Sequence, residues 1–281
     1  MTYRDSLPMQ AFVFAVIVLV CIAGCSALTG CATMPQDEPE TTSIPIERYP
    51  SVKALCVGID RVNPVDYGGW SGPLPDCELD AKEKAAEWEA YGIPTTVLLT
   101  RKATKGNVDA ALKEITADMA PGSVLFLLYS GHGGQDAGTF SSHEYLCMFN
   151  GKYYDYKDVK GNLERAPGIT VYWICDACHS GDMGRPVVFS KALNDIDCKL
   201  FLLAGCAADK TSQSTGAGGA WRLSCSVVED LRNQSVYQYF EQARELMDTT
   251  TQLPVLAEYG PITDADRDAP MLPAWFIGDS Q

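Results

Sequence analysis

The sequence lacks clustered positive charge. Its 22 Lys and Arg residues form no run, whereas 36 Asp and Glu residues give the chain a formal net charge of -14 at pH 7. Proteins that bind DNA or RNA neutralise phosphates with grouped Lys and Arg, so a nucleic-acid-binding function is not expected. A basic ligand is a more compatible partner, although an acidic balance is also a common source of solubility.

The sequence also lacks an apolar run that would span a bilayer comfortably. The run at Ala11–Gly24 is shorter than the roughly 20 residues that a transmembrane helix needs. Such a run near the amino terminus is typical of a signal-peptide core. An uncleaved signal anchor is the alternative, because Arg4 is the only basic residue ahead of the core and the next residue, Asp5, cancels its charge.

Two short segments of small residues that end in cysteine resemble the bacterial lipoprotein signal. Ile22–Cys25 adjoins the apolar core and is the preferred site, and Leu28–Cys31 is the alternative. We therefore expect residues 1–24 to be a signal peptide. Lipid on Cys25, or on Cys31, would hold an exported protein to the membrane of a bacterial cell envelope.

Residues 25–50 are expected to form a solvated tether, because the segment 32–50 is rich in Pro, Thr, Glu and Ser. Residues 51–281 are long enough for one large core. The composition of the chain, 46% hydrophobic and 21% charged, is that of a globular protein. We expect a single domain in this part.

Five nearly continuous apolar runs alternate with amphipathic segments in this domain, which predicts an α/β fold with a mostly parallel central sheet flanked by helices. One helix is expected from a cap at Asp76 to Tyr91, with Gly92 as its stop. A second carries its apolar face between residues 108 and 119. The remaining predicted helices are Ser226–Asn233 and Val236–Asp248. The predicted strands are Lys53–Ile59, Thr95–Thr100, Ser123–Tyr129, Thr170–Cys175 and Lys199–Ala204.

Polar loops follow the third and fourth predicted strands. The loop Ser-Gly-His-Gly-Gly at 130–134 leaves His132 at the edge of the sheet, and the loop Asp-Ala-Cys-His-Ser-Gly at 176–181 puts Cys178 in the equivalent place. Functional groups gather beyond the carboxyl ends of parallel strands. If the two strands are neighbours, the two side chains face each other, which is the geometry that a thiol nucleophile and its base require.

The two loops resemble the catalytic signature of the metacaspases and their bacterial relatives, a caspase-like family of cysteine peptidases. The similarity extends from about residue 52 to 228. It implies a caspase-like fold and an endopeptidase that acts on protein or peptide substrates. Four further segments carry the resemblance, namely Lys53–Asp60, Leu74–Ala81, Gly205–Ser212 and Gly218–Trp221.

The resemblance implies a role for each matched residue. Cys178 would be the nucleophile and His132 the proton-transfer group. The backbone N–H groups of Gly133 and Cys178 would form the oxyanion hole. Because two carboxylates in one pocket call for a cation, the match implies cleavage after Arg or Lys rather than after the Asp that caspases prefer. The pocket for that substrate residue would be lined by Cys77, Asp80, Ser130 and Asp176.

No cofactor is expected to be required, and no metal site is predicted. Several metacaspases are activated by calcium, but the oxygen donors of this chain do not reproduce the spacing of the family's site, so calcium dependence stays open. The site of autoprocessing is also open, with Lys191 as a candidate. The available oxygen donors are Glu144, Asp155, Asp158 and Asp182.

Two alternative functions are compatible with parts of the sequence. Cys175, Cys178 and His179 fit the attachment pattern of c-type haem, which occurs in exported proteins. Against haem, Cys175 ends an apolar strand, where it should point into the core as a small hydrophobic residue. A catalytically inactive caspase-like binding domain is the second alternative, although both dyad residues are present. The other cysteines of the domain are expected to be mostly buried thiols.

Overall fold

The computed structural model describes residues 49–137, 142–182, 193, 195–207, 211–212, 230–247 and 252–277. The predicted signal peptide, both candidate lipidation residues Cys25 and Cys31, and Lys191 lie outside these ranges. No helix in the described part of the chain is both long and apolar enough to cross a membrane.

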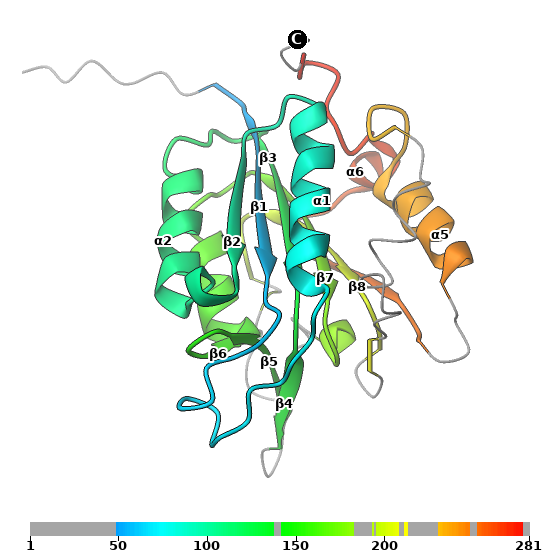
Figure 1. Ribbon diagram of the computed structural model, residues 1–281. Helices are drawn as coiled ribbons and strands as arrows, with labels where there is room; N and C mark the ends of the chain where they lie inside the picture. Colours follow the sequence, from blue (N-terminus) through cyan, green and yellow to red (C-terminus); the bar gives the residue numbers. More distant parts are fainter. Residues whose placement is uncertain are drawn as a thin grey trace, which may run out of the picture. The chain divides into compact units, whose positions relative to one another are not determined.

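A six-stranded sheet forms the centre of the described domain (Figure 1). Its order is β2-β1-β3-β7-β8-β9, and every pair of neighbours is parallel except β8 and β9. The five parallel strands begin and end within one residue of the predicted bounds, so the mostly parallel α/β fold is confirmed. The strands are β1 (Val52–Gly58), β2 (Thr95–Leu99), β3 (Val124–Ser130), β7 (Thr170–Asp176), β8 (Lys199–Ala204) and β9 (Val255–Tyr259).

Helices cover both faces of the sheet, because successive strand residues alternate between two apolar clusters. In β3, Leu127 belongs to the cluster that contains residues of α2 and α3, whereas Phe126 belongs to the cluster that contains residues of α1 and α5. Figure 1 shows α1 and α2 on either side of β1. The helices are α1 (Cys77–Ala90), α2 (Lys105–Thr116), α3 (Lys160–Leu163), α5 (Val236–Leu246) and α6 (Asp264–Asp268), with single turns η1 (Thr100–Lys102), η2 (Asp155–Val159) and η3 (Ser180–Asp182).

A row of buried aromatic rings fixes the register of the central strands. Phe126, Tyr172 and Phe201 are paired across β3, β7 and β8. Trp88 of α1 extends the row, and the ring centroids of each neighbouring pair lie 5.4 Å apart. Such aromatic pairs contribute about 0.5 to 1.5 kcal/mol each beyond the burial of their surface. The row therefore holds the carboxyl ends of β3 and β7 level with each other.

A small antiparallel sheet, which the sequence pattern did not predict, begins directly after His132. It contains β4 (Gly133–Ala137), β5 (Ser142–Met148) and β6 (Gly151–Tyr154) in that order. Asp136 accepts hydrogen bonds from Lys152 at 2.5 Å and from the Tyr154 hydroxyl at 2.7 Å. These contacts tie the first strand of the small sheet to the third.

The predicted helix at Ser226–Asn233 is wrong for its described part, because residues 230–233 form a turn before α5 begins. The carboxylate of Asp230 accepts a hydrogen bond from the backbone N–H of Arg232 at 2.8 Å. An Asp that bonds the backbone two residues on favours a turn over a helix. The helix predicted at Val236–Asp248 is confirmed from its first residue, and it ends at Leu246 because Met247 is extended.

The predicted cap of α1 also needs correction. Asp76 stands at the N-cap position, but its side chain makes no capping hydrogen bond. The carboxylate of Asp60 accepts one instead from the backbone N–H of Glu78, at 2.8 Å. The hydroxyl of Thr100 accepts a hydrogen bond from the N–H of Asp60 at 3.1 Å and so holds this capping residue in place. The start of α1 is thus positioned by residues at the ends of β1 and β2.

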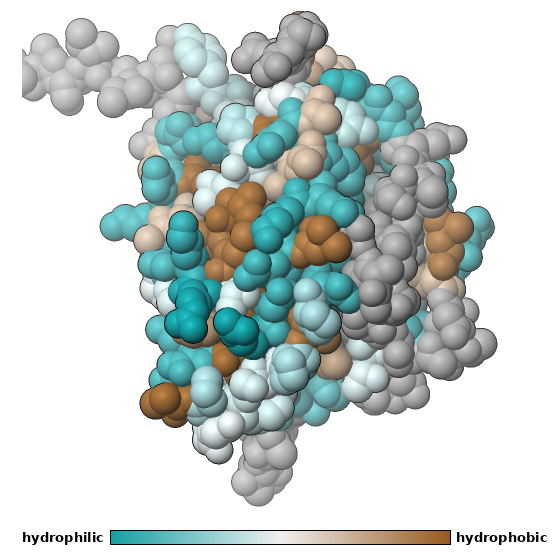
Figure 2. Space-filling model, in the orientation of Figure 1, coloured by the Kyte–Doolittle hydropathy of each residue, from teal (hydrophilic) through white to brown (hydrophobic). Residues whose placement is uncertain are grey.

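The loop between β1 and α1, residues 59–76, carries two exposed hydrophobic side chains. Val65 is 85% exposed and Trp70 is 47% exposed. On the face of the molecule shown in Figure 2, hydrophobic residues otherwise form small patches separated by hydrophilic ones. We call this segment the 59–76 loop.

Candidate active site

The loops that carry His132 and Cys178 leave the sheet side by side. Strands β3 and β7 are neighbours, and their last residues, Ser130 and Asp176, are paired in register. The backbone N–H of Gly131 donates a hydrogen bond of 3.2 Å to the carbonyl of Asp176. The two polar loops therefore start from one point at the carboxyl end of the sheet.

A cavity of about 120 Å³ opens at this end of the sheet. His132 and Cys178 both line it. Gly133, the residue after His132, packs against the carbonyl group of Cys178. The four residues expected to bind the substrate side chain also line the cavity, namely Cys77, Asp80, Ser130 and Asp176.

Four lining residues were not predicted for the cavity. Asp76 is the most informative of them, because its atom Oδ2 is buried and has no hydrogen-bond partner in the described part of the chain. The sequence pattern indicated a helix cap for Asp76, and only the three-dimensional arrangement brings it into the cavity. The four residues are Leu74, Asp76, Gly131 and Ser212.

The described lining of the cavity is acidic. Asp80, which is 4% exposed, accepts a hydrogen bond from the Ser130 hydroxyl at 2.7 Å. Asp176, which is 7% exposed, accepts one from the Ser212 hydroxyl. With Asp76 the lining includes three carboxylates, and no Lys or Arg is among the described lining residues. A cation is the ligand that such a cavity favours.

His132 is held by its backbone and by one ring nitrogen. The hydroxyl of Tyr129 and the backbone N–H of Cys147 donate to its carbonyl oxygen at 2.8 and 2.9 Å. Its Nε2 lies 2.9 Å from the carbonyl oxygen of Gly72 in the 59–76 loop. A carbonyl only accepts hydrogen bonds, so Nε2 carries the hydrogen and Nδ1 is left as the acceptor. Burial lowers the pKa of the imidazole, although the bond to Gly72 opposes this shift.

Cys178 is a half-buried thiol at a sharp turn. Burial raises the pKa of its thiol, a backbone hydrogen bond from Ser212 lowers it, and the charge of Asp176 raises it. The net shift is upward, so the resting thiol holds its proton at neutral pH. The next residue, His179, adopts the left-handed conformation with φ of 62° and does not line the cavity.

The other described cysteines are buried and form no disulfide with one another. Cys175 is fully buried in β7, and burial raises the pKa of its thiol well above the ordinary range. A thiol in this position is not accessible for a thioether bond to haem, which argues against the haem alternative. The buried cysteines are Cys56, Cys77, Cys147, Cys175, Cys198 and Cys206, and Cys225 lies outside the described residues.

The candidate calcium donors are not gathered into one site in the described part of the chain, where no group of three or more His, Cys, Asp or Glu side chains could hold a metal ion. Glu144 accepts a hydrogen bond from Gln135 at 2.8 Å. Asp158 accepts one from the backbone N–H of Tyr154 at 2.9 Å and forms an ion pair with Lys105 at 2.7 Å. The side chains of Asp155 and Asp182 lie outside the described part.

Comparison with known proteins gives concordant matches. The family model of the caspase domain matches residues 53–262. Metacaspase-2 of Trypanosoma brucei brucei is 28% identical over 234 residues, covering 66% of this chain and 65% of that protein. Metacaspase-1A of Neurospora crassa is 32% identical over 161 residues, covering 49% of this chain and 34% of that protein. The chain thus spans less than two thirds of the length of these relatives.

A solved structure gives an independent match. The crystal structure of a protein from Geobacter sulfurreducens superposes with a TM-score of 0.68 at 26% identity, covering 79% of this chain and 98% of that one. Together the matches confirm the resemblance to the metacaspases and the caspase-like fold.

Proposed function

The chain belongs to the caspase-domain family, and we propose that it is a cysteine endopeptidase in which Cys178 is the nucleophile and His132 the general base. One observation carries the proposal. The two side chains, which come from different loops, line a single cavity together with three carboxylates.

The first half of the proposed reaction forms an acyl-enzyme. The resting dyad is neutral, because the pKa of Cys178 is raised and that of His132 is lowered. As the substrate carbonyl arrives, Nδ1 of His132 accepts the thiol proton while sulfur attacks the carbonyl carbon. The backbone N–H groups of Gly133 and Cys178 would donate to the oxyanion, each contributing about 3 to 4 kcal/mol to transition-state stabilisation. Collapse expels the amine, which takes the proton from His132 and leaves a thioester on Cys178.

The second half of the reaction hydrolyses the thioester. His132 accepts a proton from water, and the oxygen attacks the thioester carbonyl carbon. Collapse breaks the carbon–sulfur bond, releases the carboxylic acid and returns the proton from His132 to sulfur. One water molecule is consumed for each peptide bond.

The acidic cavity supports cleavage after Arg, with Lys next. A guanidinium presents a planar fork of donors that can bond more than one carboxylate, whereas an ammonium group is a point charge. Asp80 of α1 and Asp176 of β7 are both buried, and both line the cavity. Asp76 adds a buried oxygen that needs a donor. We therefore include Asp76 in the proposed specificity pocket with Cys77, Asp80, Ser130 and Asp176.

Export and lipid attachment form a separate part of the proposal, supported by the amino-terminal sequence alone. The signal-peptide core and the cysteine motif at Cys25, or at Cys31, support a membrane-anchored lipoprotein of the cell envelope. Residues 25–50 would then tether the peptidase domain. Calcium dependence stays an open question, and adding Ca²⁺ or a chelator to the peptide assay tests it.

Fluorogenic peptides that differ only in the residue before the reporter test the proposal. We expect Arg to be cleaved best, Lys next, Gln and Asn barely, and Asp least. The Cys178→Ala variant is the matched control for each peptide. A protein that is folded but cleaves none of the peptides would favour an inactive binding domain, and preferential cleavage after Asp or Asn would overturn the proposed role of the carboxylates.

A further inference from the structure

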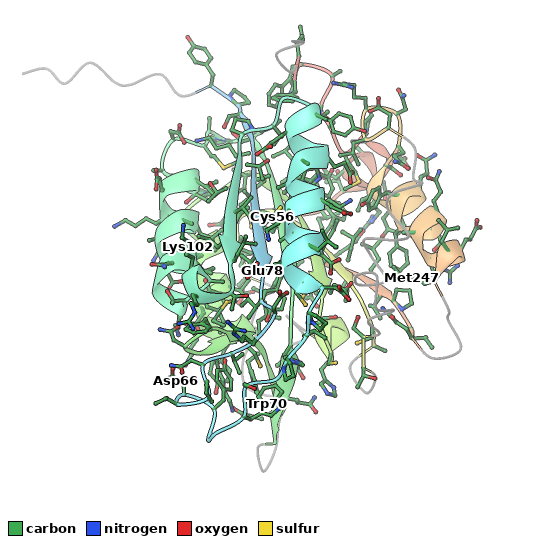
Figure 3. The ribbon with its side chains drawn as sticks, in the orientation of Figure 1. Cys56, Asp66, Trp70, Glu78, Lys102 and Met247 are labelled. Carbon is green, nitrogen blue, oxygen red and sulfur yellow. The ribbon has the colours of Figure 1, made fainter. Side chains whose placement is uncertain are left out.

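Trp70 lies against the imidazole of the proposed base. The ring centroids of Trp70 and His132 are 4.8 Å apart, and the ring planes are inclined by 55°. Trp70 comes from the 59–76 loop, more than 50 residues before His132 in the chain. Figure 3 shows it beyond the carboxyl end of β1, in the same loop as Asp66. The contact therefore joins the 59–76 loop to the histidine loop.

The 59–76 loop is fastened on both sides of Trp70. The hydroxyl of Tyr67 lies 2.8 Å from the carbonyl oxygens of both Met148 and Gly151, at the turn between β5 and β6. The backbone N–H of Val62 donates to the carbonyl of Ser71 at 2.9 Å, which closes the loop on itself. Because these bonds fix the backbone, Trp70 is held where it meets the imidazole.

Gly72 connects Trp70 to the hydrogen bond of the imidazole. A Cβ atom on Gly72 would lie 2.5 Å from the Trp70 ring and 2.9 Å from Nε2 of His132. The carbonyl of this same residue is the partner of Nε2. The indole thus packs against the residue that bonds the imidazole, as well as against the imidazole itself.

We propose that Trp70 is a positioning residue for His132, which keeps water away from the bond between Nε2 and the Gly72 carbonyl and so keeps Nδ1 available to the thiol of Cys178. The proposal rests on the assignment of His132 as the general base. An imidazole that exchanges the Gly72 carbonyl for water can rotate or change tautomer, and either change removes the acceptor from the thiol. A misplaced base slows the chemical step more than it weakens substrate binding.

The protonation of His132 gives a readout that does not need a substrate. Burial is the main reason why the pKa of His132 is low, and Trp70 supplies part of that burial. The other ionisable groups that line the cavity are Asp76, Asp80, Asp176, Cys77 and Cys178. A substitution at Trp70 leaves these groups in place. Loss of the indole should therefore raise the pKa of His132.

The experiment compares Trp70→Ala and Trp70→Phe with the wild-type protein. The chain has 3 histidines, so the imidazole resonance of His132 can be assigned by NMR with His143→Gln and His179→Gln variants. Trp275→Ala is the matched control, because Trp275 is 46% exposed, close to the 47% of Trp70, and does not line the cavity. Thermal unfolding of each variant verifies that the domain stays folded.

For Trp70→Ala we expect the pKa of His132 to rise toward its ordinary value of about 6.5. We expect kcat to fall by about ten- to a hundredfold, with KM changed far less. Trp70→Phe should keep most of the activity, and Trp275→Ala should match the wild type. An unchanged pKa of His132 in Trp70→Ala, or an effect on KM alone, would overturn the positioning role. If the wild type cleaves no peptide, the proposed function fails, while the titration still decides whether Trp70 shields the imidazole.

Discussion

A Cβ atom on Gly133 would lie 2.1 Å from the carbonyl oxygen of Cys178. The histidine loop and the cysteine loop therefore meet backbone to backbone at the position after His132. No side chain fits between them, which explains why a glycine follows the histidine. Because the two loops approach so closely, the imidazole of His132 and the thiol of Cys178 can line one small cavity.

The first prediction concerns the proposed dyad. Cys178→Ala and His132→Ala should each lower kcat/KM by at least about 10³-fold, because nucleophile and base act as one unit. His179→Ala is the control, since His179 does not line the cavity. Because the pKa of His132 is lowered, the acidic limb of the pH profile of kcat/KM should have its midpoint below about 6.5. Activity that survives Cys178→Ala would remove the dyad assignment, and a hundredfold loss in His179→Ala would make that residue the base.

The second prediction concerns the acidic pocket. Asp176→Asn should lower kcat/KM for Arg peptides by about ten- to a hundredfold, as expected for loss of a charged hydrogen-bond acceptor worth about 1.5 to 3 kcal/mol. Asp76→Asn should act in the same direction. Asp66→Asn is the control, because Asp66 is exposed in the same loop and bonds Asn63 outside the cavity. The measurement is the ratio of Arg to Gln cleavage for each variant. A ratio that stays constant while the melting temperature drops would mean that the carboxylate only supports the fold.

The third prediction uses two glycines of the 59–76 loop. Gly68 and Gly72 both have positive φ, 63° and 50°, so an alanine at either position carries a similar backbone cost. Only at Gly72 would the added Cβ meet Trp70 and His132, since nothing lies within 4 Å of one at Gly68. Gly72→Ala should therefore reduce kcat well beyond Gly68→Ala, at comparable melting temperatures. Equal effects on kcat would show that the loop backbone, rather than the contact with His132, determines the loss.

The strands and the two catalytic loops could be predicted from the sequence because their signals are local. Strands buried on both faces, such as Val124–Ser130, read as continuous apolar runs, and a polar glycine-rich loop after each of two strands is visible in the sequence itself. The positions that were missed depend on contacts distant in the chain. Gly72 lies 60 residues before His132, and no pattern in either segment indicates that they bond.

Two of the strands that were not predicted lack a signal in their own sequence. The strand Val255–Tyr259 has only one buried residue in five, so it does not read as a buried run. The strand Gly133–Ala137 contains two glycines and two polar residues, which favour a loop by composition. Its pairing with Ser142–Met148, rather than its own sequence, makes it a strand.

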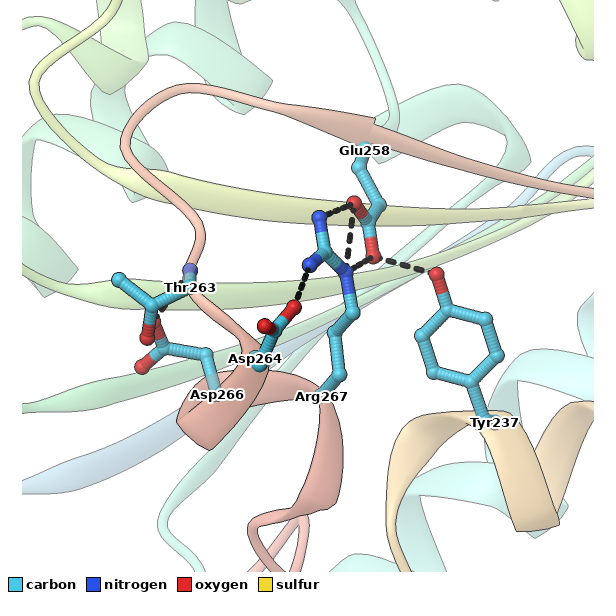
Figure 4. Close-up of polar contacts among 6 residues, drawn as sticks. All are labelled: Tyr237, Glu258, Thr263, Asp264, Asp266 and Arg267. Atoms are coloured by element: carbon cyan, nitrogen blue, oxygen red, sulfur yellow. Dashed lines mark hydrogen bonds and ion pairs between the residues drawn. The ribbon is translucent and has the colours of Figure 1, made fainter.

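The fourth prediction concerns stability and pH. Glu258 accepts hydrogen bonds from Arg267 at 2.7 to 3.1 Å and from the Tyr237 hydroxyl at 2.5 Å (Figure 4). These partners lower the pKa of Glu258, with Arg267 as the main cause. A lowered pKa in the folded state stabilises the fold above the unfolded value of about 4.3, and this contribution is lost as the pH falls through the folded value.

Glu258→Gln should therefore lower Tm by about 2 °C at pH 7 and have no effect in strong acid. Glu241→Gln is the control, because Glu241 and Arg244 form a half-exposed ion pair within α5 that should contribute little. Melting curves between pH 3 and 7 provide the measurement. If Glu258→Gln lowers Tm equally at all pH values, the packing of the side chain, and not its charge, accounts for the loss.

The fifth prediction concerns the cell envelope. The mature protein should sediment with membranes and carry lipid on Cys25, or on Cys31 if the second motif is used. Substituting the modified cysteine with Ser should release the protein, since a multiple acyl anchor gives stable attachment whereas no anchor remains in the variant. Intact mass spectrometry of the amino terminus is the measurement. An unmodified terminus that starts at Met1 would instead indicate a signal anchor.

Burial of the cysteines has a practical consequence for counting functional molecules. Among the described cysteines, Cys178 is the single one that is not buried, and burial raises the pKa of all the others whose shift is resolved. Thiolates react with electrophiles far faster than thiols do, and buried thiols are inert. Among the described cysteines, a peptide-length electrophile that ends in Arg should therefore label Cys178. The fraction of Cys178 that is labelled would report directly how many molecules in a preparation are competent.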